Sequence, residues 1–180
     1  MDDPKRREWI REAVETHQGR LIRYARLITG NAEAARDAVQ ETFLRLCREE
    51  PRRIQDHLVP WLFRVCRHRA LDARRKEGRM VSLDQSSAES PPAAAITAAG
   101  LDGRLEAQQS LRRVLAALTE LTSLQQEVLR LRFQEELSYK EISSVTGRSV
   151  SHVGVLIHEG MKELRHRLSG PAAAATEGGE

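Results

Sequence analysis

The chain has 180 residues and a net charge of only +3, from 29 Lys and Arg against 26 Asp and Glu. This length predicts one domain, or two small ones if a linker divides the chain. No apolar run approaches the roughly 18 residues of a membrane span, and no signal-peptide core follows Met1, so we expect a soluble, cytoplasmic protein. The small net charge alone does not indicate a nucleic-acid-binding protein.

Motifs of enzymes and metal sites are absent from the sequence. It contains no HExxH, GxxxxGK[ST] or GxSxG pattern, and its six histidines are scattered. Cys47 and Cys66 lack the spacing of zinc ligands, so we expect two half-buried reduced thiols, with zinc bound through Cys66 and His68 as the weaker alternative. We therefore expect no enzyme, no cofactor and no metal.

The charge is unevenly distributed along the chain. Residues 1–80 carry a net +6, residues 81–110 a net −3 and residues 111–168 a net +2. The segment Trp61–Arg79 contains seven Arg and Lys and only two acidic residues. This density of positive charge is suited to neutralising phosphates, although a solvated helix face is the alternative. Residues 81–103 are rich in Ser, Ala and Pro and predict a flexible linker.

Helical spacing predicts an all-α fold with two small domains, residues 5–80 and 104–168, followed by a disordered tail over 169–180. In the first domain, a helix ends at Gly30-Asn31 and a second runs from about Ala32 to Arg48. A polar loop from Pro51 to Pro60 precedes a third helix that carries the basic cluster. The apolar stripe of the second helix is expected to hold Ala35, Val39, Phe43 and Leu46.

The second domain has the pattern of a helix-turn-helix. A first helix ends near Leu121, and capping boxes are predicted at Ser123 with Gln126 and at Ser138 with Glu141. A tight turn at 147–149 leads into a last helix. The apolar stripe of that helix is expected to hold Val150, Val153, Ile157, Leu164 and Leu168.

Three stretches carry a family resemblance: Asp37–Leu46, then Trp61–Val65 with Ala70–Asp72 and Arg74–Arg75, and finally Leu137–Ile142. Together they resemble the sigma factors of the sigma-70 family, in the short extracytoplasmic-function (ECF) group. The first two stretches resemble region 2 and the third resembles region 4. The resemblance implies binding to core RNA polymerase, promoter-specific initiation, melting of the −10 element and contact with the −35 element.

The resemblance also implies roles for individual residues in region 2. One exposed stripe would bind the polymerase, with a plain solvated face as the alternative: Asp37, Gln40, Glu41 and Arg45. A second set would meet the melted −10 strand: Trp61, Arg64, Arg67, His68, Arg74 and Arg75. The loop Arg52–Leu58 would form a base pocket, and Trp61 could equally be a core anchor. His68 stands where the family often has Asn.

In region 4, the implied −35 contacts are Lys140, Arg148, Ser149, Ser151 and His152. The last helix departs from the family, because uncharged or acidic residues stand where basic ones are common: Gly154, Leu156, Glu159 and Met161. One interpretation keeps −35 reading through the start of the helix. In the other, Val155 and Leu156 form an apolar patch for a partner such as an anti-sigma factor or the polymerase flap.

Two other functions stay open at this point. A helix-turn-helix regulator could recognise duplex DNA without polymerase, although that would not explain the region 2 pattern. Alternatively, the chain could occupy polymerase with weakened −35 recognition.

Overall fold

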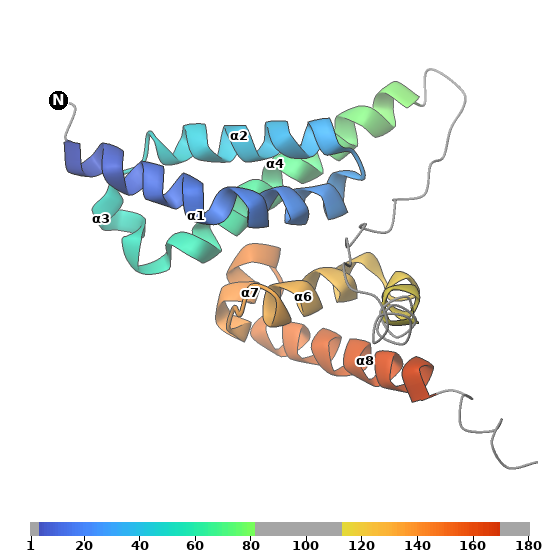
Figure 1. Cartoon of the computed structure of the whole chain (residues 1–180). Helices are drawn as coiled ribbons and strands as arrows, with labels where there is room; N and C mark the ends of the chain where they lie inside the picture. The colour runs from blue at the N-terminus through green and yellow to red at the C-terminus, as the bar shows by residue number, and fades with distance from the viewer. Residues whose placement is uncertain (1–3, 82–112, 170–180) are drawn as a thin grey trace, which may run out of the picture. The chain divides into compact units, whose positions relative to one another are not determined.

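The computed structural model describes residues 4–81 and 113–169, and every regular element within these ranges is a helix, as predicted (Figure 1). We call residues 4–81 the N-terminal unit and residues 113–169 the C-terminal unit, and each is described by itself. Most of the predicted linker and tail, and residues 104–112, lie outside the described residues. Within the described ranges, no helix has both the length and the apolar character needed to cross a lipid bilayer.

Three long helices build the N-terminal unit: α1 (Pro4–Thr29), α2 (Ala32–Leu46) and α4 (Leu58–Val81). Each packs against the other two, and Figure 1 shows them side by side. The centre of the core is formed by Leu21, Leu62 and Phe63, which are fully buried. Tyr24 meets Phe63 edge to face, with ring centroids 5.0 Å apart, an arrangement favoured by the quadrupoles of the two rings.

The predicted stop at Gly30-Asn31 is confirmed. Gly30 has φ +73° and donates its N–H to the Arg26 carbonyl at 2.9 Å, which ends α1 in the left-handed conformation that glycine adopts without strain. The Asn31 side chain then accepts hydrogen bonds from the N–H groups of Glu33 and Ala34 and caps α2. The two helices are therefore joined by one residue that stops a helix and one that starts the next.

The segment after Pro51 is not the polar loop that the sequence predicted. It forms a short helix, α3 (Pro51–Ile54), and a 3-10 turn, η1 (Gln55–His57), before α4 begins. Pro51 stands at the start of α3, where its missing N–H costs no hydrogen bond, and Ile54 is buried and anchors the segment. Pro60 is tolerated in the first turn of α4 for the same reason. At both positions, proline lies in the first turn of a helix.

Two details of the predicted packing in α2 and α4 are wrong. Thr42 rather than Phe43 is fully buried on α2, and its hydroxyl donates to the Ala38 carbonyl at 2.7 Å, so the buried oxygen is satisfied. The two thiols are not both half-buried, because Cys66 is fully buried while Cys47 is exposed. Burial raises the pKa of Cys66 to about 12, which keeps this thiol protonated at neutral pH.

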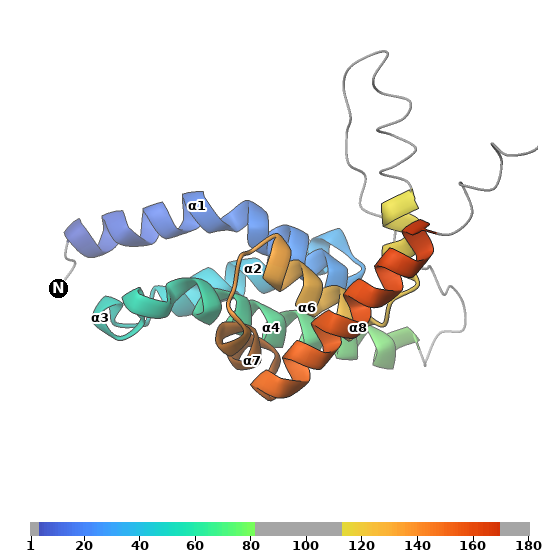
Figure 2. The same ribbon diagram turned by 90° about the horizontal axis from the view of Figure 1, so that it is seen from below.

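The C-terminal unit contains helical residues 113–119 followed by α6 (Ser123–Phe133), α7 (Tyr139–Thr146) and α8 (Val150–Ser169). Helices α6 and α8 pack together, as both views show (Figure 2). The capping box at Ser138 and Glu141 is confirmed. The other predicted box is wrong, because Thr122 caps α6 together with Gln125, one residue earlier than Ser123 with Gln126. Either register satisfies the sequence pattern, and α6 begins at Ser123.

A close approach fixes where α6 and α8 cross. A Cβ atom on Gly160 would lie 3.0 Å from Cδ1 of Leu129, so even alanine would push the leucine side chain aside. The apolar stripe of α8 is buried at Val153 and Ile157 as predicted, but Val150 is exposed and Leu156 is buried in its place. The stripe is therefore shifted toward the side of α8 that contains Leu156 and Gly160.

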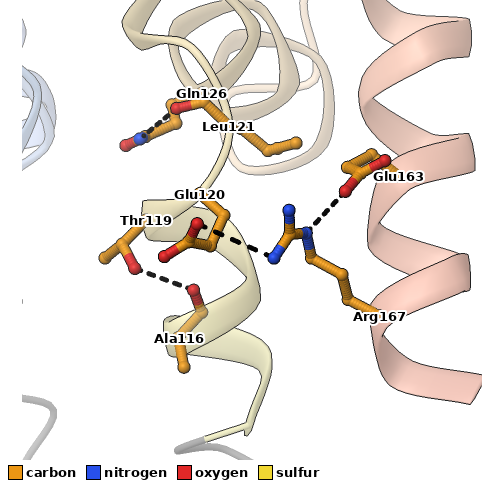
Figure 3. A network of polar contacts seen from close by, with 7 residues as sticks. All are labelled: Ala116, Thr119, Glu120, Leu121, Gln126, Glu163 and Arg167. Carbon is orange, nitrogen blue, oxygen red and sulfur yellow. Dashed lines mark hydrogen bonds and ion pairs between the residues drawn. The ribbon is translucent and has the colours of Figure 1, made fainter. Parts of the chain in front are cut away.

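Polar contacts tie the end of α8 to the start of the C-terminal unit (Figure 3). The Arg167 guanidinium reaches Glu163 on its own helix at 2.6 Å and Glu120 at 3.7 Å. Arg113 adds a hydrogen bond from its side chain to the Leu168 carbonyl at 3.2 Å. The first and last described turns of this unit consequently lie next to each other.

Candidate nucleic-acid interface

The basic cluster of the N-terminal unit follows one face of α4. Positions 64, 67 and 68, followed by 74 and 75, lie on one side of the helix, because residues three, four or seven positions apart align along a helix. Arg64, His68, Arg74 and Arg75 are exposed and Arg67 is half-buried. Beside this face, Arg75 pairs with Asp72 at 3.4 Å, which offsets part of the positive charge. The face offers a row of cations to a polyanion.

Trp61 is placed differently from the rest of the predicted −10 set. Its side chain is only 5% exposed, in the first turn of α4, so the core-anchor alternative describes its position in this structure. The predicted pocket segment Arg52–Leu58 is helical rather than a loop, yet most of its polar side chains are exposed: Arg52, Arg53, Gln55, Asp56 and His57. This segment leads directly into the cationic face of α4.

The predicted polymerase-binding residues share an exposed face of α2. Asp37, Gln40, Glu41 and Arg45 are all exposed, and Leu44 lies among them with 52% of its surface exposed. The sequence interpretation missed Leu44, although its spacing of three and four residues from Glu41 and Gln40 could have revealed it. An apolar side chain surrounded by charged ones is typical of a protein-binding patch. Next to it lies a hollow of about 460 Å³ lined in part by Leu44, Arg45 and Arg69.

An ion pair connects the α2 face to α4. The Arg69 Nε lies 3.2 Å from the Glu41 carboxylate, and both side chains are substantially exposed. Such a pair in solvent contributes at most about 1 kcal/mol to stability. It joins a residue of the predicted polymerase-binding set to the helix that carries the basic cluster.

The predicted −35 residues gather around the turn between α7 and α8. Lys140, Arg148, Ser149, Ser151 and His152 are all exposed. Gly147 ends α7 with φ +70°, and the Ser143 hydroxyl donates to the Arg148 carbonyl at 2.6 Å, which holds the turn. The Ser149 hydroxyl accepts the His152 N–H at 3.2 Å, so this serine caps the start of α8. From the sequence, only a DNA contact was predicted for Ser149.

The apolar patch predicted on α8 does not exist as proposed. Val155 is 52% exposed, but Leu156 is only 9% exposed and belongs to the core, so the two residues do not form one surface. The absence of a basic residue at position 156 is therefore a packing requirement. Among the other atypical positions, Glu159 is exposed while Gly154 and Met161 are half-buried.

Tyr139 occupies the space beside Gly154. A Cβ atom at Gly154 would lie 3.7 Å from the Tyr139 ring, an ordinary contact distance. The Arg132 guanidinium lies 5.6 Å from the centroid of the same ring, in cation–π geometry, and donates a hydrogen bond to the Leu137 carbonyl. Arg132 and Tyr139 are additional polar and aromatic groups near the turn that the sequence interpretation did not include.

Within residues 4–81 and 113–169, the structure contains no group of three His, Cys, Asp or Glu side chains placed to hold a metal ion. Cys66 and His68 differ in placement, since the first is buried and the second exposed. The chemistry of the exposed groups is that of binding: cations, amide and hydroxyl groups, and exposed apolar residues, which are Leu44 on the N-terminal unit and Phe133, Val150 and Val155 on the C-terminal unit.

Two family descriptions match the chain in the same order as its two units. Sigma-70 region 2 matches residues 13–80, and Sigma-70 region 4 matches residues 111–164, together more than half of the sequence. The chain belongs to the sigma-70 family. It is an ECF sigma factor, a non-enzymatic initiation factor that directs promoter-specific transcription with RNA polymerase. The matches confirm the predicted family and the predicted function in promoter-specific initiation, with core RNA polymerase and promoter DNA as partners.

Curated relatives extend over most of this sigma factor. It is 32% identical over 164 residues to the ECF RNA polymerase sigma factor SigE of Mycolicibacterium smegmatis, covering 88% of this chain and 61% of SigE. It is 30% identical over 165 residues to the ECF RNA polymerase sigma factor SigL of Mycobacterium tuberculosis, covering 88% of each chain. It thus spans less than two thirds of SigE and most of SigL.

A solved structure supports the fold. The sigma factor RpoE of Bartonella quintana, in complex with the anti-sigma factor NepR, aligns with a TM-score of 0.65 and 21% identity. The alignment covers 89% of this chain and 97% of RpoE. At this identity the similarity establishes the helical fold, and the region matches establish the family.

Proposed function

We propose that this sigma factor acts in the cytoplasm, binds core polymerase through α2, melts the −10 element along α4 and contacts the −35 element through the α7–α8 turn. The cationic face of α4 is the observation that carries the proposal. The family match over residues 13–80 also favours this function over a regulator that acts without polymerase. An anti-sigma factor is a further proposed partner, since RpoE was solved with one.

The −10 assignment is supported by the alignment on one face of the exposed residues Arg64, His68, Arg74 and Arg75 with the half-buried Arg67. A row of guanidinium groups neutralises phosphates, while the neighbouring segment 52–58 offers exposed polar side chains to bases. His68 presents one donor and one acceptor when neutral, so its base preference differs from that of an amide. Trp61 stays in the proposal only as the core residue that positions the start of α4.

The polymerase-binding assignment is supported by the mixed composition of the exposed α2 face. Asp37, Gln40, Glu41 and Arg45 supply directional polar contacts around Leu44, which would be the apolar centre of the interface. A double variant on α2 separates the role of this face from the role of α4. Asp37→Ala with Gln40→Ala should weaken binding to core polymerase more than promoter melting by the assembled holoenzyme. Unchanged core affinity in that pair would remove the assignment.

The −35 assignment is supported by exposed donors at the start of α8, where major-groove contacts of a helix-turn-helix concentrate. Lys140, Arg148, Ser151 and His152 are exposed, and Ser149 caps the start of α8. Binding of the full chain to promoter duplex should be measured at several salt concentrations. Undetectable binding of the full chain to a duplex that contains the −35 element, at low salt, would contradict this part of the proposal.

Run-off transcription with purified core polymerase tests the proposal as a whole. Start sites should first be mapped after overexpression, which also defines the promoter sequence. A specific start that depends on the sigma factor is the expected result. Polymerase that binds the chain but gives no specific start would instead identify an occupier of polymerase.

A further inference from the structure

The last turns of α4 are packed differently from the rest of the helix. Leu62, Phe63 and Ala70 are fully buried in the core, whereas none of the side chains at positions 71–77 is buried. Figure 1 shows the green end of α4 continuing past the loop that joins α1 to α2. A segment with few buried apolar contacts opens at little cost in free energy. Apolar packing therefore does little to fix this end of α4.

The end of α4 carries two of the arginines that we propose contact the −10 strand, Arg74 and Arg75, and both are exposed. Charge-assisted hydrogen bonds from a guanidinium to a phosphate are short, about 2.7–2.9 Å, so they form only where the helix holds the arginine within reach. The contacts of these two arginines consequently depend on where the end of the helix lies.

A hydrogen bond from the junction between α1 and α2 reaches this end of α4. The Asn31 side chain donates from Nδ2 to Oε1 of Glu77 at 3.1 Å. Glu77 is half-buried and follows Arg74 by three residues and Arg75 by two, within one turn of helix. The hydrogen bond thus links the turn that carries both arginines to the point where α1 ends and α2 begins.

Asn31 is itself held in place. Its Oδ1 accepts the N–H groups of Glu33 and Ala34 at 2.8 and 3.3 Å, and its own N–H donates to the hydroxyl of the buried Thr29 at 3.3 Å. Because Oδ1 is used by the cap, the amide NH₂ faces Glu77; the reverse orientation would set NH₂ against two backbone donors. One side chain therefore caps α2 and anchors α4.

We propose that Asn31 and Glu77 are positioning residues for promoter melting, and that their hydrogen bond holds the end of α4 where Arg74 and Arg75 reach phosphates of the melted strand. The inference rests on the proposed contact of α4 with the −10 element. Charge alone gives Glu77 the opposite effect, because a carboxylate beside two arginines repels a polyanion. The two roles therefore predict opposite results when Glu77 is replaced.

Two uncharged variants separate position from charge. Glu77→Gln keeps an oxygen that accepts from Asn31, whereas Glu77→Ala removes the acceptor, and alanine has the higher helix propensity. Open-complex formation by the holoenzyme is followed by permanganate footprinting on a promoter whose start site has been mapped. It should be about twofold to tenfold slower with Glu77→Ala than with Glu77→Gln, the range that one hydrogen bond covers. Equal rates, or a faster rate with Glu77→Ala, would overturn the positioning role.

Reversing the direction of the hydrogen bond gives an independent test. Asn31→Asp keeps the cap of α2, since Asp and Asn are equally good caps, but it sets a second carboxylate beside Glu77 and should slow open-complex formation. Adding Glu77→Gln returns the net charge to that of the wild type and supplies an amide donor for the new carboxylate. The double variant should recover the wild-type rate, and no recovery over Asn31→Asp alone would contradict the proposal.

Salt dependence distinguishes positioning from a general loss of stability. Glu77→Ala should flatten the salt dependence of open-complex formation by about one phosphate contact, whereas a loss of stability alone leaves the slope unchanged. In a background of Arg74→Gln with Arg75→Gln, which should itself slow melting, Glu77→Ala should have no further effect. Glu15→Ala, at an exposed position of α1, is the control and should change neither rate nor slope. An unchanged slope with Glu77→Ala would rule out positioning.

The remaining outcomes separate this inference from the proposed function. Circular dichroism verifies folding of each variant, and binding to core polymerase is measured alongside. Weaker core binding by Glu77→Ala than by Glu77→Gln would assign the contact to the polymerase interface and overturn the inference. Melting by the wild type with equal rates for the two variants removes the positioning role and leaves the proposed function standing. Absence of melting by the wild type would overturn both.

Discussion

Each unit has one helix that we propose contacts DNA, and the two helices have opposite chemistry. Helix α4 carries seven Arg and Lys in its 24 residues, and Arg64, Arg74 and Arg75 are exposed on one face. In α8, residues 150–161 contain only one Asp, Glu, Lys or Arg, Glu159, and several of these positions are committed to packing against α6. The N-terminal unit can therefore bind through charge, whereas the C-terminal unit depends on a few groups held by helix caps.

The largest expected effect comes from removing charge on α4. Arg64→Ala with Arg67→Ala should reduce open-complex formation about tenfold or more, because hydrogen bonds to charged groups contribute about 1.5–3 kcal/mol each. The matched pair in the C-terminal unit, Lys140→Ala with Arg148→Ala, should have a smaller effect. Permanganate footprinting over a salt series measures both. Parallel loss of core affinity in the first pair would show that the α4 cluster is structural.

Adjacent positions on α8 test whether its low charge is imposed by packing. Leu156→Arg should unfold the C-terminal unit, because it buries a charge without a partner at a position that is 9% exposed. Val155→Arg, at 52% exposure, should leave stability within about 0.5 kcal/mol and increase the salt dependence of duplex binding by about one phosphate contact. Circular dichroism and salt titrations of promoter binding measure the two effects. Equal stability of the two variants would contradict the burial difference.

Substitutions of Gly160 and of Gly154 in α8 should change the stability of the C-terminal unit in opposite directions. Gly160→Val should destabilise the unit by about 1–3 kcal/mol, because the added carbons meet Leu129 at 3.0 Å or less. Gly154→Ala has room beside Tyr139 and should stabilise α8 by up to about 1 kcal/mol through helix propensity. Hydrogen exchange of peptides from α6 and α8, measured by mass spectrometry, reports both changes. Destabilisation by Gly154→Ala would show that the tyrosine cannot adjust.

The smallest expected effect concerns the cap of α7. Hydrogen bonds from the Ser138 hydroxyl and backbone N–H hold the pKa of Glu141 below its ordinary value. The carboxylate therefore contributes stability above the ordinary glutamate pKa, and this contribution is lost as the pH falls through the lowered value. Ser138→Ala should cost about 1 kcal/mol at neutral pH.

Calorimetry from neutral pH down to about pH 3 measures the contribution of Glu141, since the window lies around and below the ordinary glutamate pKa. Glu141→Gln should flatten this part of the acid dependence of the C-terminal unit. Glu159→Gln, on the exposed side of α8, is the control and should leave the dependence unchanged. An identical pH profile for Glu141→Gln and the wild type would contradict the role of the cap.

Elements with strong local signals could be predicted from the sequence, and those decided by packing could not. The Gly30-Asn31 junction and the Ser138–Glu141 cap depend on residues close in the chain, and both were correct. The helical segment 51–57 was missed because proline both breaks and starts helices, and only burial of Ile54 selects the second role. The placement of Leu156 and Trp61 depends on contacts between helices, which the sequence spacing leaves undetermined.

The hydrogen bond from Arg113 to Leu168 joins two points of the C-terminal unit, the beginning and the end of its described residues. Both points lie at the far end of α8, a helix of 20 residues and hence about 30 Å long, from the turn that carries Arg148 and His152. A fluorophore or affinity tag attached after Ser169 would therefore sit about 30 Å from the proposed reading end of the helix. Such a label could report on promoter engagement without standing in the groove.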